Sequence, residues 1–475
     1  MENSSRDPQE KNNRRKYGEH LTSKDFFLQY IFPEIKQILM ERIWVDLYAG
    51  EGNLILPILN FVPDDKKELF FKNQVYLFDA QPKLVQKCQK NAIKYGISPD
   101  IVQKNVVLRD NLESYPDFLK KKSLPIFHIT NPPYLYLGYI RKHEETQAFL
   151  NYFRGENKGY QDLYQIAMMN DLKNGIIDLI YIIPSNFLYG ASVSNKFRRD
   201  FLKWYEITKM LVFETKIFEF TGTNTCVGFF KRKKIEKQES ICFTAHKFNK
   251  QGLMTTRNYA LKPEYKYRAG SEFEEFLIQY RSKHPFSVNY YFKKEEVEEN
   301  RGYSKITAID ANKYENNEYK TLILSINDQL KQKIEKNGLY IRTVDTGSSD
   351  GRVGLGKIQE DFQVDAIYVS GNTYRTHPIQ VFIEPKLSSL DQAIMQKYFN
   401  LVLEHFREKL DSEFLTTYKY SNTEYTRKYL GLSQARRIIE TFPLSELRDE
   451  KITKLFQLVE QGNFKELKKF LKLIL

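Results

Sequence analysis

Short apolar runs and helical patterns alternate along the first half of the chain. An apolar run without polar alternation indicates a strand buried on both faces, whereas apolar residues that recur every three to four positions indicate a helix. Strand patterns are expected at 43–47, 75–79, 106–111 and 126–130, with helical patterns at 24–40 and 82–95. Strands that alternate with helices favour parallel pairing, because each helix carries the chain back across the sheet. The pattern therefore predicts the α/β fold class, with a doubly wound and mostly parallel sheet.

The alternation continues as far as residue 230. A helix is expected at 162–172, a strand at 176–184, a helical stretch at 186–204, and two late strands at 207–213 and 225–230. The polar and aromatic segment 135–159 is expected to be a mobile loop with flexible points at Gly155 and Gly159.

The pattern changes after the basic run Lys231–Lys234. No ordered succession of strand and helix follows, and Lys, Arg, Tyr and Asn become more frequent. A change of composition at a charged run is typical of a domain boundary. We therefore expect a disordered basic tail at 1–16, an α/β domain at 17–245 and a separate C-terminal α+β domain at 246–475.

The composition favours a nucleic-acid partner. The 475 residues carry a formal net charge of +13 and include 32 Tyr and 34 Phe. Cationic side chains neutralise phosphates and aromatic rings stack on unpaired bases. A lysine-rich solvated surface would give the same composition, so the charge alone does not identify the partner.

Several classes of protein are disfavoured. The three cysteines lie far apart and the seven histidines are scattered, so neither a disulfide framework nor a metal-binding motif is expected. The N-terminus is polar, unlike a signal peptide, and no apolar run approaches the roughly 18 residues of a membrane span. We expect a cytoplasmic protein that binds neither a membrane nor a metal.

A stiff corner follows the apolar run Ile126–Thr130. The next residues are Asn131, Pro132, Pro133 and Tyr134. Proline lacks an N–H donor and fixes φ, so strand pairing must end there, at the edge of an α/β sheet where ligands bind. The Asn131 amide oxygen and the Pro132 carbonyl are two hydrogen-bond acceptors beside the flat Tyr134 ring, which suits an amino group on a planar base. A Pro-Pro turn with a core tyrosine explains the tetrapeptide equally well.

Acidic residues end the other predicted strands. Asp46 is followed by a turn that contains Gly50 and Gly52, and Asp79 and Asp110 end the second and third strands. Glycines at a strand-to-helix turn permit tight curvature and close approach of a ligand, and an acid after the second strand holds ribose hydroxyls in nucleoside-binding proteins. An ordinary strand-to-helix turn is the alternative.

Two hydroxyl residues, Thr22 and Ser23, precede the helical pattern 24–40. Either side chain can cap that helix, and the local sequence alone favours a capping role for Thr22.

Taken in order, these signals resemble the adenine-N6-specific DNA methyltransferase family of the γ motif order, in which cofactor motifs precede an Asn-Pro-Pro-Tyr catalytic motif and a C-terminal target-recognition domain. The resemblance covers about residues 17–235. Its motifs are Asp46 with Gly50 and Gly52, Asp79, Asp110, Asn131–Tyr134, Ile183–Phe187 and the region of Phe218.

The resemblance implies S-adenosyl-L-methionine as the cofactor. Thr22 would lie beside its methionine portion, while Asp46, Gly50 and Gly52 would surround the amino and carboxyl ends. Asp79 would hold the ribose hydroxyls and Asp110 the adenine amino group. Tyr48 stands where the family often has proline or phenylalanine, a mild departure.

The resemblance also implies how a target adenine is held. Asn131 and the Pro132 carbonyl would accept from the N6 amino group of a flipped-out base, with Tyr134 stacked on one face and Phe218 on the other. Phe220 lies close enough in sequence to compete for the second role. No covalent intermediate, cysteine nucleophile or metal is required.

The implied partner is double-stranded DNA, recognised at a specific sequence by residues 246–475, with a cognate restriction endonuclease acting separately in a restriction–modification system. Three alternatives remain open at this point: an RNA adenine-N6 methyltransferase, a protein-glutamine N5 methyltransferase, and a DNA-binding module with a degenerate methyltransferase fold. The large basic second half disfavours the glutamine enzyme, and the intact Asn131 and Asp46 disfavour the degenerate module.

Overall fold

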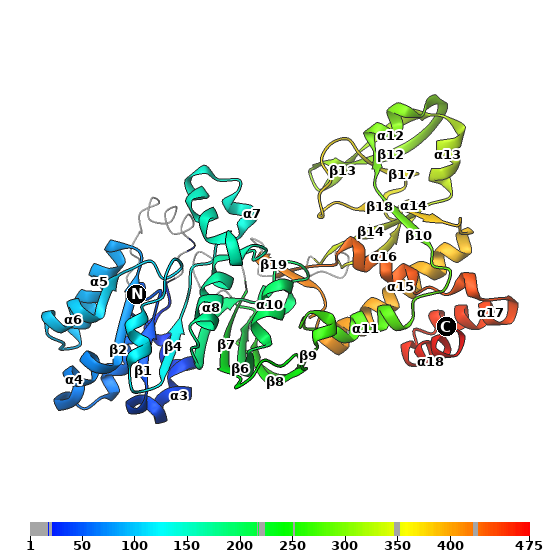
Figure 1. Cartoon of the computed structure of the whole chain (residues 1–475). Helices are drawn as coiled ribbons and strands as arrows, with labels where there is room; N and C mark the ends of the chain where they lie inside the picture. Colours follow the sequence, from blue (N-terminus) through cyan, green and yellow to red (C-terminus); the bar gives the residue numbers. More distant parts are fainter. Residues whose placement is uncertain are drawn as a thin grey trace. The chain divides into compact units, whose positions relative to one another are not determined.

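The computed structural model describes Gly18, Ile217 and residues 21–215, 224–249, 252–345, 352–420 and 426–475. The chain divides into two compact units, Met1–Ala269 and Gly270–Leu475. Each unit is described by itself (Figure 1). The expected tail at 1–16 and the stacking candidate Phe218 lie outside the described residues.

The first unit is built on one sheet, in which nine strands are described in the order β3-β2-β1-β4-β5-β7-β6-β8-β9. Neighbours from β3 to β5 pair in parallel, β7 is antiparallel to both β5 and β6, β8 is parallel to β6, and β9 is antiparallel to β8. The strands are β1 (Ile43–Asp46), β2 (Val75–Asp79), β3 (Val106–Leu108), β4 (Ile126–Thr130), β5 (Asp178–Pro184), β6 (Tyr205–Phe213), β7 (Thr225–Arg232), β8 (Ile241–Phe248) and β9 (Met254–Leu261). The prediction of an α/β fold with a large, mostly parallel central sheet is confirmed.

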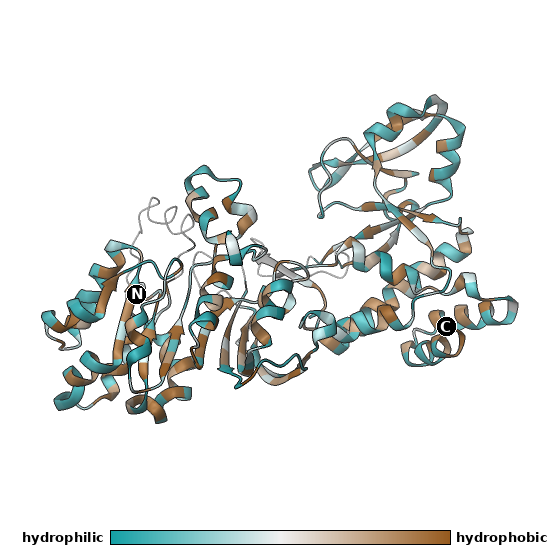
Figure 2. Ribbon diagram, viewed as in Figure 1, coloured by the Kyte–Doolittle hydropathy of each residue, from teal (hydrophilic) through white to brown (hydrophobic). Residues whose placement is uncertain are grey.

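Both faces of this sheet are covered. Ile43 and Val45 on β1 belong to one buried cluster and Trp44 between them to another, because successive side chains on a strand point to opposite faces. Residues of three helices belong to the Trp44 cluster: α4 (Asp64–Gln74), α5 (Pro82–Lys94) and α6 (Pro99–Asn105). Residues of α8 (Leu163–Lys173) and α10 (Asn195–Leu202) belong to the other cluster (Figure 1). Apolar residues accordingly concentrate along the strands, and polar residues on the outer turns of the helices (Figure 2).

The helices of the first unit agree with the sequence pattern in part. The predicted helix at 24–40 is α2 and α3 joined by a π-helical turn and followed by a 3₁₀ turn, and the stretch at 186–204 is interrupted at Gly190. The segment 135–159, expected as a mobile loop, contains helical turns. The helices are α2 (Lys24–Phe26), α3 (Phe32–Ile35), α4 (Asp64–Gln74), α5 (Pro82–Lys94), α6 (Pro99–Asn105), α7 (Leu137–Ile140), α8 (Leu163–Lys173), α9 (Asn186–Tyr189) and α10 (Asn195–Leu202), with 3₁₀ turns at Lys36–Glu41, Leu56–Phe61, Asp117–Lys121, Glu144–Phe153 and Gly155–Asn157.

The first unit extends beyond the boundary expected after residue 245. That boundary would cut β8, which pairs with both β6 and β9 in the same sheet. The division therefore falls between Ala269 and Gly270, because the backbone pairing of two more strands continues past the basic run.

The second unit has an α+β arrangement. Its sheets run β10-β18-β14-β16, β11-β17-β12-β13 and β15-β20-β19 among the described residues. The strands are β10 (Ser287–Tyr290), β11 (Phe292–Lys293), β12 (Arg301–Glu315), β13 (Glu318–Ile326), β14 (Leu339–Arg342), β15 (Val344–Asp345), β16 (Gly354–Lys357), β17 (Ala366–Val369), β18 (Ile379–Glu384), β19 (Thr416–Tyr420) and β20 (Thr426–Tyr429). The helices are α11 (Ser271–Gln279), α12 (Lys294–Glu299), α13 (Asp328–Glu335), α14 (Ile358–Phe362), α15 (Ser389–Leu410), α16 (Leu432–Glu440), α17 (Asp449–Glu460) and α18 (Phe464–Ile474), with a 3₁₀ turn at Leu444–Glu446. A further 3₁₀ turn, Pro263–Tyr265, belongs to the first unit and lies near its end.

Two searches of the described residues gave negative results. In that part of the chain, no helix combines the length and apolar character needed to cross a membrane. Nor do three or more His, Cys, Asp or Glu side chains gather there in a group that could hold a metal ion.

Candidate active site

The Asn-Pro-Pro-Tyr corner follows β4, which lies between β1 and β5 in the sheet. The Asn131 amide is held from two sides. Its Nδ2 donates to Thr22 Oγ1 over 3.1 Å, and its Oδ1 accepts from the Tyr134 hydroxyl. The Tyr134 hydroxyl also lies 2.5 Å from the Ile182 carbonyl oxygen on β5. The amide therefore has a fixed direction before any ligand binds.

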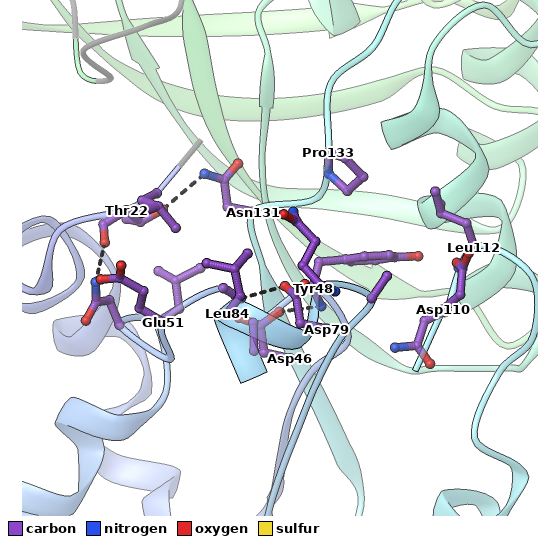
Figure 3. A pocket seen from close by; sticks show the side chains of 18 of the residues that line it. Thr22, Asp46, Tyr48, Glu51, Asp79, Leu84, Asp110, Leu112, Asn131 and Pro133 are labelled. Atoms are coloured by element: carbon purple, nitrogen blue, oxygen red, sulfur yellow. Dashed lines mark hydrogen bonds between the residues drawn. The ribbon is translucent and has the colours of Figure 1, made fainter. Parts of the chain in front are cut away.

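Thr22 belongs to this corner rather than to the helix cap. The side chain of Ser23 caps α2, accepting from Phe26 N over 3.2 Å, so the capping role that the local sequence favours for Thr22 is wrong. Thr22 is only 6% exposed, and its carbonyl oxygen accepts from Asn53 Nδ2 over 3.0 Å. One residue thus links the Asn131 amide to the glycine turn (Figure 3).

Gly18 lies against the corner. Its carbonyl oxygen accepts from Tyr134 N over 3.0 Å. Its φ is +67°, and a Cβ there would lie 2.4 Å from the Tyr134 carbonyl oxygen. Only glycine fits this approach without a shift of the backbone.

The glycine turn after β1 folds back onto β2. Gly50 and Gly52 have φ values of +55° and +84°. The Gly50 N–H donates to Asp79 Oδ2 over 2.9 Å, and a Cβ on Gly52 would lie 2.6 Å from Leu56 Cδ1. The two glycines are therefore required by the backbone conformation, and Gly52 also by close packing.

The three strand-end acids each accept hydrogen bonds. Asp46 is buried and accepts from Thr130 Oγ1 over 2.5 Å and from Tyr48 N over 3.0 Å. Burial raises the pKa of Asp46 to about 6, although the Thr130 hydrogen bond opposes the shift. Burial also raises the pKa of Asp79, which accepts from the backbone of Gly50 and of Gln81.

These groups meet in a cavity of about 270 Å³. Its walls include six residues predicted from the sequence: Thr22, Asp46, Gly50, Asp79, Asp110 and Asn131 (Figure 3). Gly52 lies in the glycine turn behind the wall, and Pro132 and Tyr134 lie in the corner beside it. Pro133 contributes to the wall instead.

Two aromatic residues of the cavity were missed by the sequence analysis. Phe149 and Tyr152 line the wall from the 3₁₀ turn Glu144–Phe153. The Tyr152 hydroxyl donates to Asp110 Oδ2, while Asp110 Oδ1 accepts from Leu112 N over 3.0 Å. Burial, followed by the hydrogen bond to Asp110, raises the pKa of Tyr152. No periodic pattern marks this segment, so only the fold shows that both rings line the cavity and that Tyr152 contacts the acid.

Two polar atoms of the wall lack a hydrogen-bond partner among the described residues. They are the Tyr48 hydroxyl and Asn111 Oδ1, and both are buried. The Tyr48 ring extends from the end of β1 toward Leu112 (Figure 3). Buried polar atoms are almost always paired, so these two fit a cavity that holds polar ligand groups or ordered water.

A buried histidine supports the first strand from below. His128 on β4 accepts from Leu47 N at Nε2 over 3.2 Å, and its Nδ1 lies 2.6 Å from Asp171 Oδ2. The ring therefore carries its proton on Nδ1 and donates it to Asp171. Tyr181 on β5 donates to the same carboxylate oxygen over 2.5 Å. This network joins the residue that follows β1 to β4, β5 and α8.

Residues 12–333 match the model of one protein family, described as N-6 DNA Methylase. The match spans more than half of the chain. The chain belongs to the N-6 DNA methylase family. No curated protein matches the chain.

Three solved structures are distantly similar to this chain. The chain of a DrdV–DNA complex is 11% identical with a TM-score of 0.39, over 54% of this chain and 31% of that one. A modification subunit of a putative type I restriction enzyme from Vibrio vulnificus YJ016 is 12% identical with a TM-score of 0.36, over 51% and 56%. The type IIG restriction endonuclease BpuSI is 13% identical with a TM-score of 0.42, over 97% and 66%. The chain thus spans between 31% and 66% of the length of these three, and their likeness adds nothing to the family assignment.

Proposed function

We propose that this protein transfers a methyl group from S-adenosyl-L-methionine to N6 of a flipped-out adenine in double-stranded DNA. One observation carries the proposal: the Asn131 amide, fixed by Thr22 and Tyr134, opens on the cavity that also contains the glycine turn and the acids Asp46, Asp79 and Asp110. Membership of the N-6 DNA methylase family favours DNA over RNA or protein as the substrate.

The cavity wall suits the three parts of this cofactor. Asp46, Thr22 and the backbone at Gly50 and Gly52 would hold the methionine portion, with the Asp46 carboxylate facing its amino group. Asp79 would accept from the ribose hydroxyls. When bound, S-adenosyl-L-methionine would supply a methyl group activated by a sulfonium.

Asp110 would accept from the adenine amino group of the cofactor. Phe149 and Tyr152 would bound this end, because both line the wall and Tyr152 donates to Asp110. The unpartnered hydroxyl of Tyr48 and Asn111 Oδ1 offer further hydrogen bonds to polar ligand atoms or to ordered water.

The target amine would be held by the β4 corner. Adenine N6 is a poor nucleophile because its lone pair is delocalised into the ring. Asn131 Oδ1 and the Pro132 carbonyl would accept its two N–H bonds and favour a more tetrahedral nitrogen, with the lone pair directed away from the acceptors. A carbonyl oxygen has two lone pairs, so accepting from Tyr134 is compatible with accepting from the amine.

The base must leave the duplex to reach this corner, which costs a few kcal/mol. Stacking on an aromatic ring returns about 1–3 kcal/mol per base. Tyr134 would supply one ring and Phe218 the other. We also propose that the DNA is recognised at a specific sequence by the second unit and that a separate restriction endonuclease cuts the unmodified site.

The test is to incubate the full-length protein with S-adenosyl-L-methionine labelled in its methyl group and with duplex DNA, structured RNA or a release-factor-like protein. We expect label in DNA, recovered as N6-methyladenine by mass spectrometry after digestion. Label that appears only in RNA or protein would contradict the proposal.

A further inference from the structure

The connection between β17 and β18 in the second unit contains a short exposed segment. Residues Gly371–Thr376 are all exposed, and their sequence is Gly-Asn-Thr-Tyr-Arg-Thr. This 371–376 loop contains no acidic and no aliphatic side chain. Every residue after the glycine carries a side-chain hydrogen-bond donor. Asn372 Nδ2 donates to the Tyr374 hydroxyl over 3.5 Å, and the Thr373 side chain forms a hydrogen bond with Tyr291.

The start of the 371–376 loop is fixed by one asparagine on β12. Asn312 Oδ1 accepts from Gly371 N over 2.9 Å, and its Nδ2 donates to the Asn372 carbonyl oxygen over 2.8 Å. A side-chain amide that pairs with both a backbone N–H and a backbone C=O reproduces the pairing of a neighbouring strand. The side chain of Asn372 takes no part in these two bonds.

The other end is fixed by a buried threonine. Thr343 is 1% exposed, and its Oγ1 donates to the Arg375 carbonyl oxygen over 2.6 Å. His377 N donates to the Tyr374 carbonyl oxygen over 3.2 Å. The backbone is therefore held from both sides while its side chains remain in solvent, a combination typical of binding loops on a rigid scaffold.

The support beneath the loop leaves polar atoms unsatisfied. Asp310 is 1% exposed and accepts from Ser370 Oγ over 3.0 Å through Oδ1. Within the described ranges, Asp310 Oδ2 and His377 Nδ1 are buried without a hydrogen bond, and the Lys313 ammonium is 3.8 Å from Asp310 Oδ2. Buried groups without hydrogen bonds lower stability. Sequences depart from the best local arrangement mainly where function requires it.

Arg375 is the side chain that such a scaffold presents. In the part of the chain that the structure describes, its guanidinium makes no hydrogen bond and no ion pair, although its backbone is held by Thr343. Arginine reads guanine through paired hydrogen bonds to O6 and N7, and asparagine reads adenine through N6 and N7. Arg375 and Asn372 thus offer the two side chains that pair most specifically with base edges.

We propose that the 371–376 loop reads base edges in the major groove of the DNA substrate, with Arg375 on a guanine and Asn372 on an adjacent base. The proposal rests on the proposed function, because it names the recognition surface of that reaction. The net charge of +13 suits a polyanion, and a loop without acidic residues approaches it without repulsion.

The experiment selects sequences from a random duplex pool with the full-length protein, independently of methyl transfer. Three variants are compared with the wild type: Arg375→Ala, Asn372→Ala, and Arg301→Ala as a control that removes the same charge from another exposed position of this unit. Methylated positions are then mapped by sequencing DNA incubated with S-adenosyl-L-methionine.

We expect the wild type to enrich one motif and Arg375→Ala to lose discrimination at a single G·C position, with affinity for the selected site reduced on the order of ten- to hundredfold. Asn372→Ala should lose discrimination at a different base pair of the motif. Arg301→Ala should keep the motif, and all variants should bind the cofactor as the wild type does.

Two results would overturn the inference. One is that Arg375→Ala and Asn372→Ala select the same motif as the wild type. This includes the case in which affinity falls equally for all sequences, which would indicate phosphate contacts. The other is a wild type that enriches no motif. If the loop variants relax the selected motif but no wild-type DNA becomes methylated, the proposed function fails and the loop inference stands. If DNA is methylated and both variants select the same motif as the wild type, only the loop inference fails.

Discussion

The cavity of the first unit and the 371–376 loop of the second unit both hold polar groups in fixed directions, but they use opposite geometries. In the cavity, the side chains of Asp46, Asp79, Asp110 and Asn131 point inward from strand ends, and backbone N–H groups orient the acids. In the loop, side chains from below hold the backbone, and the loop's own side chains point out.

The difference follows from the ligands that the two regions suit. A small molecule is recognised by groups that converge on it from all sides, so the site is concave and excludes water. A base edge in a groove is reached only by side chains that project from a stiff support. The first region depends on strand order in the sheet, whereas the second depends on a few side chains that hold one loop.

The largest effect is expected from removing the side-chain amide of Asn131, which lines the cavity. Asn131→Ala should lower methyl transfer by at least 10²–10³-fold, because preorganised groups that act on the reacting atom contribute about that much. Binding of S-adenosyl-L-methionine, measured by calorimetry, should remain. Asn73→Ala, at an exposed position of α4, is the matched control. Retained turnover in Asn131→Ala would remove the amide from the mechanism.

The next effect concerns the buried support of the cavity. His128→Ala removes a partner of the Asp171 carboxylate and of the Leu47 N–H. The carboxylate keeps its hydrogen bond from Tyr181, so the cost is that of leaving buried polar groups unsatisfied, about 1–3 kcal/mol. We expect a loss of that size in the free energy of unfolding measured with urea. His143→Ala, at a histidine whose side chain is 41% exposed, should change it by less than about 0.5 kcal/mol. A small loss for His128→Ala would show that the network beneath the cavity is dispensable.

A third test measures how the affinity of the cavity for the cofactor depends on pH. Burial raises the pKa of Asp46 to about 6, so the carboxylate is charged above that pH and becomes neutral below it. Affinity for S-adenosyl-L-methionine should be constant above about pH 6 and fall by up to about tenfold per unit below it, because the neutral acid attracts the amino group less. Asp46→Asn should bind weakly and without this dependence. A wild-type affinity that is flat from pH 5 to 8 would contradict the assignment.

The smallest effect is expected at the adenine end of the cavity. Tyr152→Phe removes the hydroxyl that donates to Asp110 but keeps the ring. A single hydrogen bond to a charged group contributes about 1.5–3 kcal/mol when buried, and water can replace it at a partly open wall. We therefore expect a two- to tenfold loss of cofactor affinity in calorimetry. Tyr139→Phe, on the exposed turn nearby, should have no effect, and an equal loss there would attribute the change to the segment as a whole.

Much of the first unit follows from local sequence patterns. Strands such as β1 and β4 are mostly apolar, and each is followed by residues that disfavour a strand, glycines after β1 and prolines after β4. The segment 135–159 was not predictable in this way. Its residues have no period, and its helical turns lie against a wall formed by residues distant in the sequence.

The sequence by itself determined which functional residues follow each strand. They are, in chain order, an acid with a glycine turn, two further acids, and the Asn131 corner. Local propensity suffices for that, because each feature lies within a few residues. Only the tertiary structure decided that Thr22 holds Asn131, that Tyr152 holds Asp110, and that Asn312 and Thr343 hold the 371–376 loop. The partners are separated by 32 to 109 residues, so strand pairing and core packing, rather than the neighbouring sequence, place their polar atoms within hydrogen-bond distance.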